Sequence, residues 1–152
     1  AKIHNLRGDF YHSLGDREKM YADYDSTLIY DPGNINVLNN YAYYLSVEGR
    51  DLKRALQMSS RTLEAEPLNA TYLDTYAWIL FKMKRYNDAL GYMEKALRYL
   101  ETDNPEIYEH YGDVLIMCGE KEKALENWHK AVQFNSTSPT IEQKIKQEKY
   151  LE

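Results

Sequence analysis

Apolar side chains recur along this chain at spacings of three and four residues, and they form two stripes in each stretch of about 34 residues. In residues 70–104 the two stripes are Leu73, Tyr76, Ala77 and Leu80, then Ala89, Leu90, Met93, Ala96 and Leu97. This spacing places each stripe along one face of an α-helix. Two stripes in one stretch therefore predict a helical hairpin.

Small residues recur at matching positions and show that the hairpin is repeated. A small side chain at a fixed point of a helix lets a neighbouring helix approach closely. A period of this length is typical of solenoids, whose units pack mainly against their neighbours. We therefore expect an all-α solenoid of about four hairpins. The three series of markers are Gly8, Ala42, Ala77 and Gly112; Met20, Ala55, Ala89 and Ala124; and Thr27, Thr62, Ala96 and Ala131.

The markers divide the chain into units at residues 1–34, 35–69, 70–104 and 105–138, within a single domain, 1–152. A strongly polar tail follows at 139–152, and we expect it to form a capping helix. Ile141 and Ile145 in this tail would cover the exposed end of the last hairpin.

The predicted turns inside the hairpins contain glycine in three of the four units, at Gly15, Gly49 and Gly119. Glycine just past a helix end adopts the left-handed conformation at little cost. The third unit has Lys84 at this point, so we expect strain there. Pro105 is expected in the first turn of a helix, where its missing N–H costs nothing.

These recurring residues resemble the tetratricopeptide repeat (TPR) family. The resemblance covers 1–138 and implies a non-catalytic scaffold that binds a protein or peptide in a groove lined by the first helix of each hairpin. The pentatricopeptide family, whose repeats are of similar size and bind RNA, is the nearest rival. The matching residues are Gly8, Tyr11, Tyr24 and Pro32; Ala42, Ala55 and Pro67; Ala77, Ala89 and Ala96; and Tyr108, Gly112, Ala124, Trp128 and Ala131.

The net charge argues against the RNA-binding alternative. With 19 basic and 24 acidic residues, the chain carries a charge of -5 and would repel a phosphate backbone. No apolar stretch is long enough to cross a bilayer, and Cys118 alone forms no intrachain disulfide. The segments 73–80 and 85–90 also resemble repeats of bacterial cell-envelope lipoproteins, which leaves the compartment open between envelope and cytoplasm.

The TPR resemblance carries the groove-facing positions over to this chain one by one. They are Asn5, Asp9 and His12; Asn36, Asn39, Tyr43 and Ser46; Asp74, Trp78 and Phe81; and Glu109, Asp113 and Ile116, flanked by Asn40 and Lys82. From these we expect partner contacts at Asn39, Asn40, Tyr43, Asp74, Trp78, Phe81, Lys82, Glu109 and Asp113. The carboxylates favour a neutral or basic partner segment.

The aromatic residues Tyr43, Trp78 and Phe81 allow two interpretations. Aromatic side chains on a groove are good binding anchors, but at helical spacing they also pack against adjacent helices. If they are binding anchors, replacing Trp78 and Tyr43 by alanine should abolish partner capture with little effect on stability. If a neighbouring segment covers them, the repeats are a structural spacer that packs against other parts of a larger chain or assembly.

The sequence predicts no catalytic site and no cofactor. The histidines are scattered, and no nucleophile–base arrangement, phosphate-binding loop or zinc spacing accompanies them. Glu106, Glu109, His110 and Asp113 come nearest to a metal cluster, but helical spacing pairs Glu106 with His110 and Glu109 with Asp113 in different directions. We expect them to form a solvated acidic face.

Overall fold

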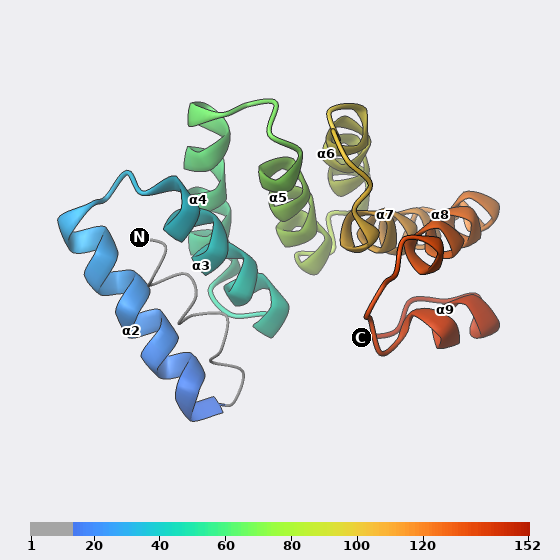
Figure 1. Ribbon diagram of the computed structural model, residues 1–152, viewed down its shortest axis with the longest axis horizontal. Helices are drawn as coiled ribbons and strands as arrows, with labels where there is room; N and C mark the ends of the chain where they lie inside the picture. Colours follow the sequence, from blue (N-terminus) through green and yellow to red (C-terminus); the bar gives the residue numbers. More distant parts are fainter. Residues whose placement is uncertain (1–13) are drawn as a thin grey trace.

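A computed structural model describes residues 14–152, which form eight α-helices and, within that range, no strand. Successive helices pair antiparallel and stack into an elongated array (Figure 1). This confirms the predicted all-α solenoid. The helices are α2 (Leu14–Tyr30), α3 (Ile35–Glu48), α4 (Leu52–Ala65), α5 (Ala70–Lys82), α6 (Tyr86–Arg98), α7 (Pro105–Met117), α8 (Lys121–Gln133) and α9 (Ile141–Gln147).

Several expectations for the first unit lie outside the described residues. They concern the marker Gly8, the matching Tyr11, and the groove positions Asn5, Asp9 and His12. Gly15 is described, and the prediction that it separates two helices is wrong: it lies in the first turn of α2. Gly15 is also absent from the glycines with positive φ, so it provides no left-handed turn.

Three asparagines at equal intervals start the first helices of the hairpins. Asn34, Asn69 and Asn104 precede α3, α5 and α7, and each side-chain Oδ1 accepts a hydrogen bond from a backbone N–H of the first helical turn. Each bond satisfies a donor that the helix itself leaves free. Pro105 follows Asn104 at the first helical position, as predicted.

The turn inside each described hairpin contains a residue in the left-handed conformation. Gly49 has φ 68°, Gly119 has φ 84°, and Lys84 has φ 64°. Lys84 therefore adopts the glycine conformation with a full side chain, as predicted from the substituted position. Its Cβ makes this conformation costly.

The marker residues pack where the helices approach most closely. Ala42, Ala55, Ala77 and Ala89 are fully buried. Gly112 on α7 faces Trp128 on α8, and a Cβ built on Gly112 would lie 2.4 Å from the Trp128 Cδ1 and Nε1 atoms. Small residues at these positions therefore set the distance between helices.

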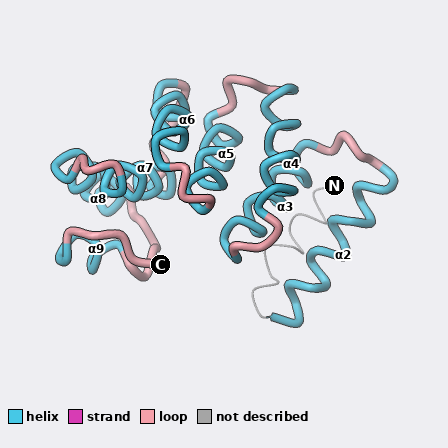
Figure 2. Tube along the Cα trace, turned by 180° about the vertical axis from the view of Figure 1, so that it is seen from behind, coloured by secondary structure: helices cyan, strands magenta, loops and turns pink. Residues whose placement is uncertain are grey.

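The end of the chain differs from the expected capping helix over 139–152. Helix α9 covers Ile141–Gln147 only, and Glu148 ends it with φ 54°. Ile141 is buried against Tyr108, Trp128 and Ala131, as a cap requires. After Glu148 the chain turns back toward the middle of the array, as Figure 1 and the reverse view in Figure 2 both show. No helix within the described range is long and apolar enough to cross a membrane.

Candidate functional site

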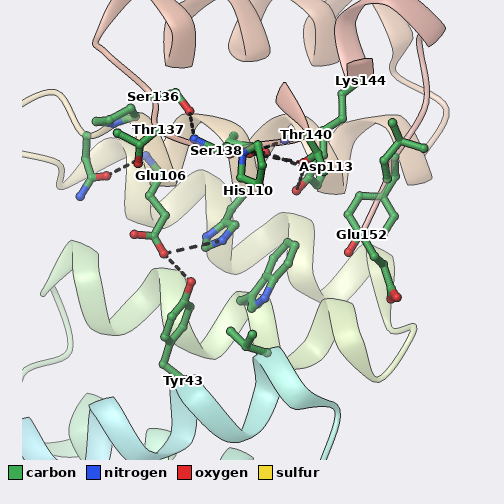
Figure 3. Close-up of a pocket in the computed structure, with 18 of the residues that line it drawn as sticks. Tyr43, Glu106, His110, Asp113, Ser136, Thr137, Ser138, Thr140, Lys144 and Glu152 are labelled. Atoms are coloured by element: carbon green, nitrogen blue, oxygen red, sulfur yellow. Dashed lines mark hydrogen bonds and ion pairs between the residues drawn. The ribbon is translucent and has the colours of Figure 1, made fainter. Parts of the chain in front are cut away.

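A cleft of about 1000 Å³ lies between the first helices of three hairpins and the C-terminal residues (Figure 3). Tyr43 and Val47 line it from α3, and Trp78 and Lys82 from α5. Helix α7 contributes Glu106, Glu109, His110 and Asp113. The remaining walls come from the loop 135–140, from Lys144 on α9 and from residues 150–152.

Two aromatic side chains of α5 stack at this cleft, and we call them the aromatic platform: Trp78, which lines the cleft, and Phe81, which lies beside Trp78 and does not line it. Their rings stack at a centroid distance of 4.6 Å and an angle of 11°. The ring of His110 stacks on Trp78 at 4.0 Å, and Tyr150 meets Phe81 edge-on at 5.0 Å. Trp78 is therefore only 7% exposed and Phe81 only 4%.

His110 stands at the centre of a buried polar cluster. Its Nδ1 lies 2.9 Å from Asp74 Oδ1, and its Nε2 lies 3.9 Å from Glu106 Oε1. Tyr43 donates a hydrogen bond of 2.5 Å to the same Glu106 oxygen, so Tyr43 and His110 approach Glu106 from two helices (Figure 3). Burial alone would lower the pKa of His110, but the carboxylates of Asp74 and Glu106 outweigh it and raise this pKa to about 9. These carboxylates therefore favour the protonated form of His110.

Lys144 joins α9 to α7 in a second buried cluster. Its Nζ lies 2.6 Å from Glu109 Oε2 and 2.9 Å from Asp113 Oδ1. Asp113 Oδ1 also accepts a hydrogen bond of 3.1 Å from Trp128 Nε1, and Ser138 Oγ donates one of 2.8 Å to Glu109. Burial raises the pKa of Asp113 to about 6, and the charge of Lys144 opposes this rise.

These two clusters correct the expectation of a solvated acidic face. Glu109, His110 and Asp113 are buried, because His110 faces Asp74 on α5 and Lys144 comes from α9 to neutralise the other two. Glu106 alone of the four keeps a largely exposed side chain, at 56%. Within residues 14–152 no three carboxylate, histidine or cysteine side chains are grouped to hold a metal ion.

The structure brings together most of the residues expected to contact a partner. Tyr43, Trp78, Lys82, Glu109 and Asp113 line the cleft. Asp74 is covered by His110, and Phe81 by Tyr150. Asn39 and Asn40 are not among the residues that line the cleft. Asn39 is buried, and its Oδ1 has no hydrogen-bond partner among the described residues.

Sequence reasoning missed His110, Lys144 and Tyr150 as parts of this site. A signal for His110 existed, because it follows Asp74 by 36 residues, about one repeat, and repeat-related positions on successive first helices lie side by side. Lys144 and Tyr150 lie beyond the last repeat, where the period gives no register. Both ring nitrogens of His110 face carboxylates, Nδ1 that of Asp74 and Nε2 that of Glu106.

Comparisons with known proteins agree with this architecture. A family model described as tetratricopeptide repeat matches residues 3–134. A TPR repeat-containing protein of Methanocaldococcus jannaschii is 24% identical over 149 residues, and the match spans 87% of this chain but only 26% of that curated relative. Because this relative is archaeal, the resemblance to bacterial envelope proteins stays a prediction.

Two solved structures illustrate the shared fold. The Pseudomonas aeruginosa pilF protein is 22% identical, with a TM-score of 0.76 over 97% of this chain and 66% of its own. YrrB, described as a TPR protein with an unusual peptide-binding site, is 23% identical, with a TM-score of 0.65 over 80% of this chain and 62% of its own. At these identities the likeness concerns the fold alone.

Proposed function

This chain belongs to the tetratricopeptide repeat family, a family of protein-interaction scaffolds, and we propose that it holds a segment of a partner protein in the cleft between α3, α5 and α7. One observation carries the proposal. Equivalent positions of three successive first helices, Tyr43, Trp78 and Asp113, line one cleft of about 1000 Å³. Clefts of this size with aromatic walls and a few fixed polar groups are typical binding sites.

The charges of the cleft favour a partner segment that is uncharged or weakly basic. His110 neutralises Asp74, and Lys144 is shared by Glu109 and Asp113, so the acidic residues predicted from the sequence are largely compensated inside the protein. The less buried charges on the walls are Glu106, Glu152 and Lys82, and Lys82 Nζ lies 3.5 Å from Glu152 Oε1. Because Lys82 is paired with Glu152, Glu106 is the remaining exposed wall charge, and it favours an uncharged or weakly basic segment over an acidic one. Nucleic acid remains disfavoured by the net charge of -5.

A peptide-binding test can use two valines with the same exposure. Val47 on α3 lines the cleft, whereas Val132 on α8 does not, and both are 43% exposed. A phage library of random 12-residue peptides is selected on the immobilised chain, and the enriched peptides are then measured by fluorescence polarisation. We expect Val47→Arg to weaken binding by at least about tenfold, because the larger, charged side chain would collide with a peptide bound in the cleft. Val132→Arg should bind like the wild type.

Two outcomes would contradict the proposal: a selection that enriches no peptide, or enriched peptides that bind both arginine variants equally well. The second candidate function, a structural spacer, is favoured by the contact of Tyr150 with the aromatic platform. A cleft that its own chain fills permanently would bind no peptide in the selection.

A further inference from the structure

Residues 148–152 follow α9, and we call them the C-terminal strap; Tyr150, Leu151 and Glu152 of this strap form one wall of the cleft. Glu148 starts the strap in the left-handed conformation, which turns the chain away from α9. Tyr150 then packs edge-on against the aromatic platform, with ring centroids 5.0 Å from Phe81 and 6.4 Å from Trp78. Lys144 Nζ lies 5.2 Å from the centroid of the Tyr150 ring. Edge-on rings and a cation over the ring face are both favourable arrangements.

The ion pairs of the strap are weak. Lys82 Nζ lies 3.5 Å from Glu152 Oε1, but the Glu152 side chain is 80% exposed. Glu148 pairs with Lys121, and both of these side chains are also well exposed. Exposed ion pairs contribute little, because water screens them and ordering two long side chains costs entropy. The strap is therefore held by the half-buried side chains of Tyr150 and Leu151 and by a backbone hydrogen bond from Lys149 N to Lys144 O.

The surface beneath the strap is well suited to receive a different aromatic side chain. Trp78, Phe81 and His110 form a stacked set whose geometry the strap does not supply, because all three come from α5 and α7. Lys144 is fixed by Glu109 and Asp113, so its charge stays in place when Tyr150 leaves. A ring from another chain would meet the same platform and the same cation.

We propose that the C-terminal strap covers the aromatic platform at one wall of the cleft, and that the partner is a protein segment whose aromatic side chain displaces Tyr150 from Trp78 and Phe81. This proposal rests on the proposed function, since it specifies how a segment enters the same cleft. The contact of Tyr150 with the aromatic platform, which also favours the spacer function, is then the contact that a partner must replace: the strap covers the platform until a partner segment binds there.

The test repeats the selection of 12-residue peptides on three proteins: the wild type, Tyr150→Ala and Tyr30→Ala. Tyr30 is the matched control, because it is 89% exposed at the end of α2 and does not line the cleft. We expect enriched peptides to bind Tyr150→Ala at least tenfold more tightly than the wild type or Tyr30→Ala. They should share an aromatic residue, and replacing it by alanine should abolish the gain. Circular dichroism checks that each variant keeps its helices.

A second measurement needs no variant. Lys149 is exposed within the strap, so displacing the strap should open the bond after Lys149 to trypsin. Saturating wild-type protein with an enriched peptide should therefore speed trypsin cleavage after Lys149, measured by mass spectrometry, whereas a scrambled peptide should not.

The outcomes separate the two proposals. Equal affinities for the wild type and Tyr150→Ala, with unchanged trypsin cleavage, would overturn the strap and leave peptide binding intact. Enriched peptides without a shared aromatic residue would overturn the partner chemistry. A selection that fails on all three proteins would overturn both proposals. If gel filtration shows a dimer that Tyr150→Ala abolishes, the strap would contact the platform of a second copy, and its role as a cover of its own chain's platform would be overturned.

Discussion

Gly112 provides a sharp test of how these helices pack. It lies in α7, where replacing glycine by alanine normally stabilises a helix by about 1 kcal/mol. Here a new Cβ would lie 2.4 Å from two atoms of the Trp128 ring and 3.1 Å from the Ala124 carbonyl oxygen. Trp128 is fully buried and donates to Asp113, so its ring has no free space to enter and loses a hydrogen bond if it moves.

The magnitude follows from these opposing contributions. Forcing an extra group into a packed core costs about 1–3 kcal/mol. Loosening the bond from Trp128 to the charged Asp113 adds about 1 kcal/mol or more. After subtracting the helix gain, Gly112→Ala should lower the free energy of unfolding by about 2 kcal/mol, a fall in Tm of about 4–8 °C for a chain of this size.

Gly91 is the matched control, because it is a helical glycine of α6 that is exposed and has no atom within 4 Å of the added Cβ. Gly91→Ala should raise the free energy of unfolding by about 0.5–1 kcal/mol. Urea unfolding followed by far-ultraviolet circular dichroism measures both changes. If Gly112→Ala were as stable as Gly91→Ala, the packing argument at Trp128 would be refuted.

Two further predictions concern a turn and a charge. Lys84→Gly should raise the free energy of unfolding by about 1 kcal/mol, because it removes the cost of a lysine in the left-handed conformation. Gly119→Lys should lower the free energy of unfolding for the same reason. Urea unfolding midpoints that move in the opposite directions would exclude strain at Lys84. His110, which faces Asp74 on α5 and Glu106 and Asp113 on its own helix, has its pKa raised to about 9 from an ordinary value of 6.5. Its stabilising contribution is therefore complete below about pH 6.5 and is lost as the pH rises through about 9, an effect on the order of 3 kcal/mol. The unfolding free energy of wild type minus His110→Gln, measured by urea titration between pH 6 and 10, should fall across this window; a constant difference would show that His110 gains no proton on folding.

Repeat-wide features were predictable from the sequence because the same physical constraint acts in every unit. Ala42, Ala77 and Gly112 recur because each first helix must admit a close neighbour, so the period exposes them. Lys84 was recognised as costly because Gly49 and Gly119 show what the turn requires. The asparagine caps Asn34, Asn69 and Asn104 recur with the same regularity, so the sequence carries a signal for them as well.

The chemistry of the cleft was only partly predictable, because it depends on contacts outside the repeat. Asp74, Glu109 and Asp113 were expected as exposed acids, yet their counter-ions are His110, one unit away, and Lys144, beyond the last unit. The expectation that Trp78 and Tyr43 could be replaced with little effect on stability also conflicts with the structure. Trp78 stacks on His110 and Phe81, and truncating a buried tryptophan costs about 3–5 kcal/mol.

The asparagine caps also bear on how the chain folds. Asn34, Asn69 and Asn104 each fix the start of a helix through atoms no more than three residues away, so every hairpin carries its own local start signal. Helix initiation is the unfavourable step in helix formation. Because three sites can each initiate a helix, folding of the chain does not depend on one particular segment. Folding of such a chain can begin at whichever hairpin forms first and spread to its neighbours. Loss of one cap should slow folding that begins at that hairpin, while folding that begins at the other two hairpins continues.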